Sequence, residues 1–305
     1  MGYKSNITKA DRTTESPGFP EVILIDNFSG CNLKCSICDH KNIKKYRKIM
    51  KMDINLYKKI IDEVAYFNSN ARIWEIFFGD PFLCNDMPKR IKYAKDQGLN
   101  DVVLNTNGVL MSAEKSKALI DAGLDAMYVG IDAIKEETYN KIRIGGNYQK
   151  VVKNVLDYRD LLIRYDNKKQ KLFVQFVLTE FNEDEVDYFK NYWSSEGVGV
   201  KIRPKVTWGG LTTADNLLPN EAVIRKPCYW IMRTINICAD GNVTYCTCDI
   251  HCQIKTGNIV LQTIKDVWDV ELKKYRDMHA QNRFEELPEM CRNCSDWQSA
   301  YATFY

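Results

Sequence analysis

Residues 22–38 read VILIDNFSGCNLKCSIC, an apolar segment that runs directly into three cysteines. The Val, Ile and Leu residues of its first half predict a buried β-strand. Cys31, Cys35 and Cys38 then follow on one loop with C-x3-C-x2-C spacing, and soft thiolates select iron–sulfur clusters, zinc or copper(I). Structural zinc needs four protein ligands, whereas a cluster held by three cysteines leaves one iron open for a substrate or cofactor. The segment therefore predicts an open iron–sulfur site at the end of a strand.

A rhythm of strand and then helix continues along the chain. Further apolar or β-branched segments predict strands at 73–78, 101–108, 126–132, 171–179, 199–204, 233–238 and 242–246. Apolar residues recur at helical spacing in segments 54–66, 87–97, 113–122 and 151–165. Gly98, Gly123 and Gly197 fall just after helix-like segments, where a left-handed cap residue is expected.

Alternating strands and helices imply parallel strands joined by right-handed crossovers, hence an α/β barrel or a doubly wound sheet. Six strands before residue 206 fall short of the eight of a complete barrel. In either architecture a ligand lies at the carboxyl ends of the strands. The segments SGCNLKC, FGDPFL, NTNG and GIDA all stand at such ends. We therefore expect them to meet at a single mouth.

Changes in composition divide the chain. We expect an arm at 1–20, the α/β domain at 21–206, a connection rich in Gly, Thr, Asn and Pro at 207–227, and a cysteine-rich module at 228–305. The module begins with a hairpin turned by Ala239-Asp240-Gly241-Asn242.

Composition and charge exclude several classes of protein. The 305 residues are 45% hydrophobic and 27% charged, as in an ordinary globular protein. The net charge of +3 is too small to indicate nucleic acid as a partner. The sequence has neither an apolar run of about 20 residues nor a signal-peptide core, so we expect a cytoplasmic protein without a membrane partner. Eleven cysteines, an odd number, then argue against a disulfide framework.

The motif CNLKCSIC (31–38) resembles the CxxxCxxC signature of the radical S-adenosylmethionine (SAM) superfamily. The resemblance implies a partial (β/α)6 TIM-like barrel in which Cys31, Cys35 and Cys38 bind a [4Fe–4S] cluster. It also implies that the methionyl group of SAM chelates the open iron and that reduction of SAM yields a 5'-deoxyadenosyl radical. A flavodoxin- or ferredoxin-like reductant is implied as a partner.

Three further motifs resemble the same family, in the expected order. Gly79-Asp80-Pro81 looks like its GGEP motif, which receives the amino group of SAM, and Thr106-Asn107-Gly108 looks like its TNG. Gly130-Ile131-Asp132, followed by Arg143, resembles the S-x-D and x-R-G segment, and Arg143 is suited to the SAM carboxylate. The resemblance therefore implies a set of cofactor-binding residues, namely Gly79, Asp80, Pro81, Asn107, Gly130, Asp132 and Arg143.

A second group of cysteines supplies four thiolates, from Cys228, Cys246, Cys291 and Cys294. Four ligands suit either structural zinc or a fully coordinated [4Fe–4S] cluster. The run of cysteine, hairpin, cysteine and final CxxC resembles the SPASM module or its shorter twitch form, which implies one auxiliary [4Fe–4S] cluster.

Three cysteines of this region, Cys238, Cys248 and Cys252, are then surplus. Cys248 stands two residues after Cys246, and we consider it as a hydrogen-atom donor that projects toward the barrel mouth, or else as a packed cysteine. His251 and His279 are expected to be surface or capping residues. His40 is expected at the surface or in contact with a ligand.

The leading hypothesis is an enzyme that cleaves SAM reductively and abstracts a hydrogen atom from a small polar substrate. A carbohydrate or aminocyclitol is favoured, with either epimerisation or two-electron oxidation as the outcome. A maturase of ribosomal peptides, again as epimerase or crosslinker, is the first alternative. A non-catalytic zinc or iron–sulfur protein is the second, but a scaffold has no reason to leave its first site with three ligands.

Overall fold

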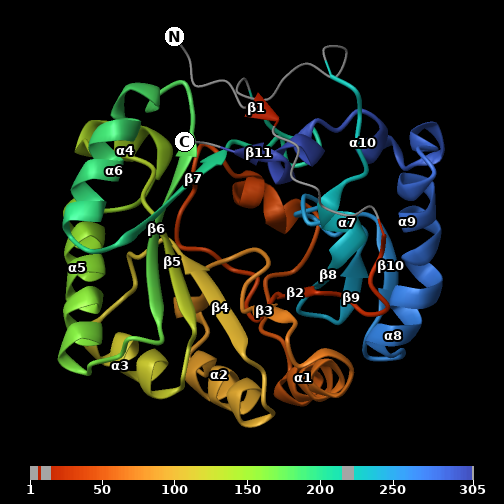
Figure 1. The fold of residues 1–305 in the computed structure, drawn as a ribbon, viewed down its shortest axis with the longest axis horizontal. Coiled ribbons are helices and arrows are strands. Elements are labelled where there is room, and N and C mark those ends of the chain that lie inside the picture. Colours follow the sequence, from red (N-terminus) through yellow and green to blue (C-terminus); the bar gives the residue numbers. More distant parts are fainter. Residues whose placement is uncertain (1–5, 8–14, 215–222, 304–305) are drawn as a thin grey trace.

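A computed structural model describes residues 6–7, 15–214 and 223–303 of the chain. Its centre is one curved nine-stranded sheet with the order β10-β9-β8-β2-β3-β4-β5-β6-β7 (Figure 1). The six predicted strands of the α/β domain form one parallel run: β2 Val22–Ile25, β3 Arg72–Trp74, β4 Asp101–Thr106, β5 Ala126–Gly130, β6 Lys171–Leu178 and β7 Gly199–Pro204. The expected partial barrel of six parallel strands is confirmed.

The helices connect successive strands and pack outside the sheet (Figure 1). They are α1 Ile54–Asn68, α2 Met87–Asp96, α3 Ala113–Asp121, α4 Glu136–Ile142, α5 Tyr148–Arg164 and α6 Val186–Ser195. The apolar stripe predicted for α1 faces the core: Ile54 is partly buried, and Tyr57, Ile60, Ile61 and Val64 are fully buried. Asp53 begins this helix, because its carboxylate accepts the backbone N–H groups of Asn55 and Leu56.

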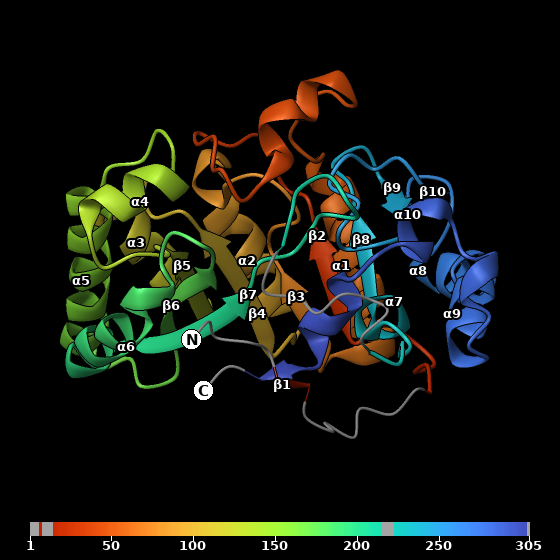
Figure 2. The ribbon, with the colours of Figure 1, turned by 90° about the horizontal axis from the view of Figure 1, so that it is seen from above.

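The C-terminal region extends the same sheet. Strand β8 (Thr234–Ile237) lies parallel to β2, and β9 (Asn242–Thr244) and β10 (Lys255–Asn258) then follow antiparallel. The predicted turn from β8 to β9 has Gly241 at φ +83°, a conformation that glycine adopts without strain. Its helices are α7 Tyr229–Arg233, α8 Ile264–Asp266, α9 Lys273–Ala280 and α10 Glu289–Arg292, and α8 and α9 lie at the end of the molecule opposite α5 and α6 (Figure 2).

A small ribbon of β1 (Asn6–Ile7) and β11 (Ala302–Thr303) pairs segments near the two ends of the chain. Neither strand was expected from the sequence, and β10 was also missed, because such short segments have no apolar alternation. No helix of the described residues is long and apolar enough to cross a membrane.

Candidate active site

The loop with the first three cysteines is fixed by backbone contacts to a distant segment. The N–H groups of Lys34 and Ser36 donate to the carbonyl oxygens of Ile144 (3.0 Å) and Ile142 (2.9 Å). Because Ile142 and Ile144 flank Arg143, these bonds bring the arginine beside the loop. The three predicted cysteines carry free thiols and line one cavity of about 250 Å³ at the carboxyl ends of the strands.

The thiols of this loop already face hydrogen-bond donors. The Cys31 Sγ accepts from the Leu33 N–H at 3.5 Å and faces Asn107 Nδ2 at 3.8 Å. The Cys35 Sγ faces Arg143 Nη1 at 3.9 Å. Burial raises the pKa of Cys31 to about 11 and that of Cys38 to about 12, so positive charge from a metal is needed to keep them as thiolates.

The donor set suits a cluster better than a single ion. Structural zinc needs four protein ligands, and this loop offers three thiols. Cysteines around a [4Fe–4S] cluster have no common metal atom, since each binds a different iron. Three free thiols that line one cavity, with N–H donors around them, fit this second arrangement.

The segment Gly79-Asp80-Pro81 packs against the start of the cysteine loop. A Cβ atom on Gly79 would lie 2.3 Å from the Phe28 carbonyl oxygen, and φ here is +134°, so only glycine fits. The Asp80 carboxylate accepts from the N–H groups of Phe82 (3.0 Å) and Asn107 (2.8 Å) and from the Thr106 hydroxyl (2.9 Å). Asp80 thus fixes the turn with Asn107 to the cavity wall, and burial raises its pKa.

Arg143 is held by Asp132. The Asp132 carboxylate accepts from Arg143 Nε at 2.6 Å and from the Val177 N–H at 2.8 Å. Burial alone would lower the pKa of Arg143, but the neighbouring Asp132 raises it, so the guanidinium stays charged. A Cβ atom on Gly130 would lie 2.2 Å from Arg143 Nη2. Because Gly130 has no side chain, the Arg143 guanidinium can occupy this space.

The inner wall of the barrel adds polar residues that the sequence analysis missed. Asn105 Nδ2 donates to Gln175 Oε1 at 3.0 Å, and both side chains line the cavity together with Arg203 from β7. Asn105 and Gln175 interrupt apolar strands, DVVLNT and KLFVQFVL, and this was the signal that could have found them. His40 also lines the cavity, where its Nε2 lies 2.9 Å from the Ser29 carbonyl oxygen.

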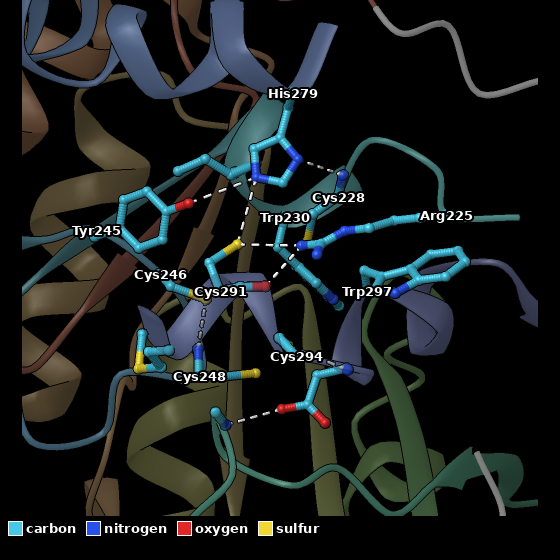
Figure 3. A pocket seen from close by; sticks show the side chains of 14 residues that line it. Arg225, Cys228, Trp230, Tyr245, Cys246, Cys248, His279, Cys291, Cys294 and Trp297 are labelled. Carbon is cyan, nitrogen blue, oxygen red and sulfur yellow. Dashed lines mark hydrogen bonds between the residues drawn. The ribbon is translucent and has the colours of Figure 1, made fainter. Parts of the chain in front are cut away.

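The second group of cysteines also meets in one place (Figure 3). Cys228, Cys246, Cys291 and Cys294 carry free thiols and line a cavity of about 20 Å³. Cys228 precedes α7, Cys246 follows β9, and the last pair comes from α10 and the turn after it. The structure therefore brings together the four cysteines that the sequence analysis grouped.

Cys248 lines the second cavity and not the first. Its N–H donates to the Cys246 Sγ at 3.3 Å. A hydrogen bond with Cys246, together with burial, raises the pKa of its thiol, so Cys248 is protonated at neutral pH. The sequence hypothesis had this side chain project toward the barrel mouth, and the structure puts it in the wall beside Cys246.

One short segment separates the two cavities. Trp208 lines the first cavity and its neighbour Gly209 lines the second. The Asp296 carboxylate accepts from Thr207 N–H (2.5 Å), Thr207 Oγ1 (2.9 Å) and Gly209 N–H (3.0 Å). Asp296 therefore anchors this wall to the C-terminal region.

The prediction of surface positions for two histidines is wrong. His279 is 0% exposed and lies against the second cavity (Figure 3). Its Nδ1 accepts the Cys228 N–H at 3.3 Å, and its Nε2 faces Cys291 Sγ at 3.7 Å. Burial lowers the pKa of His279 to about 3, so the ring is neutral. His251 is 2% exposed and pairs with Asp39 at 2.7 Å.

Cys238 and Cys252 form a disulfide, although the sequence analysis expected free thiols. They join the turn after β8 to the segment before β10, and both lie in a small apolar cluster with Leu24, Phe77 and Phe78. The remaining nine cysteines carry free thiols.

Family models match both parts of this architecture. Residues 28–191 match the radical SAM superfamily, and residues 228–295 match the SPASM iron–sulfur cluster-binding domain. The chain therefore belongs to the radical SAM superfamily. Within it, the chain is a member with a C-terminal SPASM domain, and its cofactors are SAM, the [4Fe–4S] cluster of the superfamily and an auxiliary [4Fe–4S] cluster.

Curated proteins that are similar in sequence match only part of this chain. A probable GTP 3',8-cyclase of Methanococcus maripaludis is 37% identical over 125 residues, which are 41% of each chain. The GTP 3',8-cyclase of Limosilactobacillus fermentum is 30% identical over 187 residues, or 60% of this chain and 53% of that protein. The chain thus spans only about half or less of the length of these curated relatives.

Solved structures are similar over nearly the whole chain. BtrN in complex with AdoMet and 2-DOIA has a TM-score of 0.62 at 19% identity and covers 90% of this chain and 93% of its own. SuiB of Streptococcus suis bound to precursor peptide SuiA has a TM-score of 0.69 at 12% identity, with 93% and 71% covered. At sequence identities of 19% and 12%, these similarities show a shared fold only.

Proposed function

We propose that this radical SAM enzyme abstracts a hydrogen atom from a small polar substrate bound between its two cysteine sites. A carbohydrate or aminocyclitol is the proposed substrate, and epimerisation or two-electron oxidation is the proposed outcome. The observation that carries the proposal is the cavity beside the first cysteines, which has polar side chains in its wall and borders, at Trp208, the segment whose next residue, Gly209, lines the second cavity.

In this proposal Cys31, Cys35 and Cys38 hold the first cluster, and Cys228, Cys246, Cys291 and Cys294 hold the auxiliary cluster. A cluster and SAM held there would supply one-electron reduction of SAM, and hence a 5'-deoxyadenosyl radical able to take a hydrogen atom from the substrate. Arg143 carries the positive charge for the SAM carboxylate, and Asp132 holds that guanidinium in place. Gly79, Asp80, Asn107 and Gly130 line the cavity around it, whereas Pro81 lines a different cavity.

The polar lining supports a substrate with hydroxyl or amino groups. Asn105 and Gln175 present carboxamides inside the barrel, and such groups accept from and donate to hydroxyls. Phe77, Phe78 and Trp208 give the same cavity an apolar side that excludes water. A flavodoxin- or ferredoxin-like protein is the proposed reductant.

Cys248 separates the two outcomes. Its protonated thiol stands beside Cys246, and a hydrogen atom passed from its S–H to a substrate radical would complete an epimerisation. The thiyl radical left on Cys248 would then take one electron from the reductant and one proton from solvent. If instead the substrate radical gives its electron to the auxiliary cluster, the product is oxidised and Cys248 has no chemical part. Both outcomes can be tested once the substrate is identified. Full turnover by Cys248→Ala would exclude the hydrogen-donor role, whereas uptake of solvent deuterium into the product of the wild type would support it.

A second candidate is the reaction of the curated relatives. The identity of 37% with a probable GTP 3',8-cyclase favours a nucleoside triphosphate substrate, although only 41% of that protein is matched. Incubation of the reduced enzyme with SAM and GTP distinguishes the candidates. Consumption of GTP would favour the cyclase reaction, and unchanged GTP beside SAM cleavage would favour the first proposal.

A further inference from the structure

Arg203 has an unusual position among the arginines around the cavity. It is the penultimate residue of β7, its side chain is only partly exposed, and it lines the cavity of the first cysteines. Among the described residues its guanidinium has no hydrogen bond, ion pair or ring contact. Arg143, in the same wall, is by contrast bonded to Asp132 at 2.6 Å.

The other ionisable groups of this wall are already engaged. The Asp80 carboxylate accepts three hydrogen bonds, and His40 contacts a backbone carbonyl oxygen. The three thiols are the ones proposed to bind the cluster. Burial lowers the pKa of Arg203, and the Asp132 carboxylate, which opposes this effect, makes no contact with it. Arg203 therefore brings a positive charge into the cavity that no described side chain neutralises by contact.

A charge in such a place is costly unless an anion pairs with it. A guanidinium presents a planar fork of N–H donors that matches the oxygens of a carboxylate or phosphate. We propose that Arg203 binds an anionic group of the substrate, a phosphate or a carboxylate, and so orients the substrate between the two cysteine sites. This inference rests on the proposed function and narrows its substrate class to anionic molecules.

The carboxylate of SAM is the competing occupant. Arg143 lies at the cysteine loop and faces Cys35. Arg203 stands on β7 in the wall of the cavity, and within the described residues it contacts neither the cysteine loop nor Asp132. This arrangement assigns Arg143 to SAM and leaves Arg203 for the substrate.

The test is calorimetric titration of inorganic phosphate, and separately of acetate, into the reconstituted full-length protein loaded with SAM at constant ionic strength. We expect at least one of the two anions to bind about tenfold or more weakly to Arg203→Met than to the wild type, because the variant loses a charge-assisted hydrogen bond. Lys201→Met is the matched control. It removes the same charge from the same strand, and Lys201 is exposed outside the cavity over the Phe173 ring.

The anion that is preferred identifies the group, phosphate or carboxylate. Equal affinity of wild type and Arg203→Met for both anions would overturn the inference, as would a loss of SAM affinity in Arg203→Met with anion binding intact. Arg203→Lys provides a second variant if the methionine variant does not fold, and it is expected to bind the anion with intermediate affinity. SAM cleavage by the wild type is measured in parallel, so a failure of the proposed function is distinguished from a failure of this inference.

Discussion

At the scale of single residues, the site depends on close approaches that the motifs alone do not reveal. The resemblance implied cofactor-binding roles for Gly130 and Arg143, and both line the cavity, but it did not give the reason for glycine at 130. A side chain on residue 130 would occupy the place of the Arg143 guanidinium. His279 and Arg225, whose Nη2 donates to Cys291 Sγ at 3.5 Å, could not be predicted, because their contacts come from tertiary packing of distant segments.

Gly130→Ala should therefore impair SAM binding without unfolding the protein. The nearest atom, Arg143 Nη2, is the end of a flexible side chain and can move away. We expect the dissociation constant of SAM to rise about tenfold, as for loss of one charge-assisted contact, while the melting temperature changes little. Gly18→Ala is the control, since a Cβ atom there meets nothing within 4 Å. Unchanged SAM affinity in Gly130→Ala would show that Arg143 does not bind SAM.

His279 should raise the reduction potential of the auxiliary cluster. Its Nδ1 accepts from the Cys228 N–H, so the proton is on Nε2, which faces Cys291 Sγ. Hydrogen bonds to cluster sulfurs are one of the factors that set the potential. We expect His279→Phe to lower it by about 40 mV, the equivalent of a hydrogen bond of about 1 kcal/mol, in a redox titration followed by electron paramagnetic resonance. His251→Phe serves as control, and an equal shift in both variants would contradict a specific contact.

At the scale of helices and strands, periodicity predicted most of the fold. The eight predicted strands exist, and the stripe on α1 is buried as expected. Several strands end earlier than predicted, because the run of apolar residues in the sequence continues after the chain has left the sheet. Strand β3 ends at Trp74, and the next residue, Glu75, instead joins a buried polar network.

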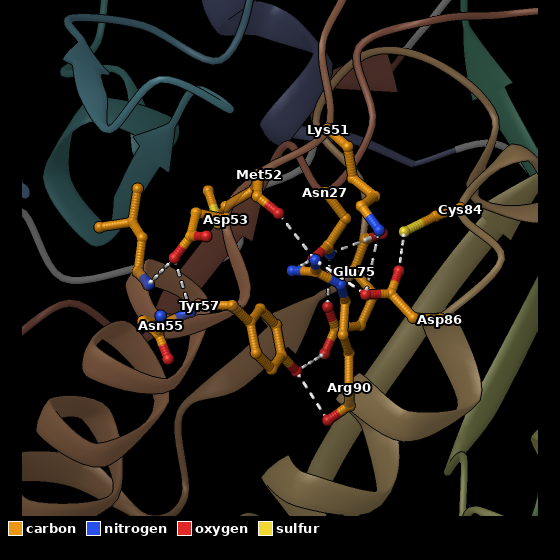
Figure 4. Close-up of polar contacts among 11 residues, drawn as sticks. Asn27, Lys51, Met52, Asp53, Asn55, Tyr57, Glu75, Cys84, Asp86 and Arg90 are labelled. Carbon is orange, nitrogen blue, oxygen red and sulfur yellow. Dashed lines mark hydrogen bonds and ion pairs between the residues drawn. The ribbon is translucent and has the colours of Figure 1, made fainter.

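This network ties β2, α1, β3 and α2 together (Figure 4). Glu75 accepts from the Tyr57 hydroxyl at 2.5 Å and from Asn27 Nδ2 at 2.6 Å, and Arg90 donates to Asn27 and to the Met52 carbonyl oxygen. Burial raises the pKa of Glu75 from 4.5 to about 7, although both hydrogen bonds oppose this. The folded protein therefore binds a proton there more tightly than the unfolded chain.

Stability should consequently fall as pH rises through this range. Protonated Glu75 contributes up to about 3 kcal/mol to the free energy of unfolding. This contribution is fully present below pH 4.5 and is lost as the pH rises to about 7. Glu75→Gln cannot ionise, so its melting temperature should decrease less than that of the wild type between pH 5 and pH 8. If the melting temperatures of the two proteins decrease equally between pH 5 and pH 8, Glu75 does not titrate in this range.

At the scale of the whole molecule, the two halves share one sheet. Strand β8 pairs with β2 from Val22 to Ile25, so residues 228–305 cover an edge of the barrel. The sequence predicted two modules but could not show this pairing, since strand order depends on contacts between residues more than 200 positions apart. The segments that carry the two cysteine sites are thereby joined to one nine-stranded sheet.

A truncation after residue 206 should therefore not give a soluble barrel. Loss of β8 exposes the unpaired edge of β2 together with its buried apolar side chains, and open edges promote aggregation. Size-exclusion chromatography is expected to show aggregates for 1–206 and a defined peak for the full chain. A monodisperse truncated protein would contradict the dependence of the barrel on β8.

The most direct test of the enzyme's chemistry is mass-spectrometric detection of 5'-deoxyadenosine after anaerobic reconstitution, with dithionite and SAM. The wild type should contain about eight irons per chain, as two four-iron clusters require, and should produce 5'-deoxyadenosine. The variant with alanine at Cys31, Cys35 and Cys38 should retain about four irons and produce none. Stoichiometric zinc without cleavage in the wild type, or cleavage that persists in the triple variant, would contradict a radical-generating site at these three cysteines.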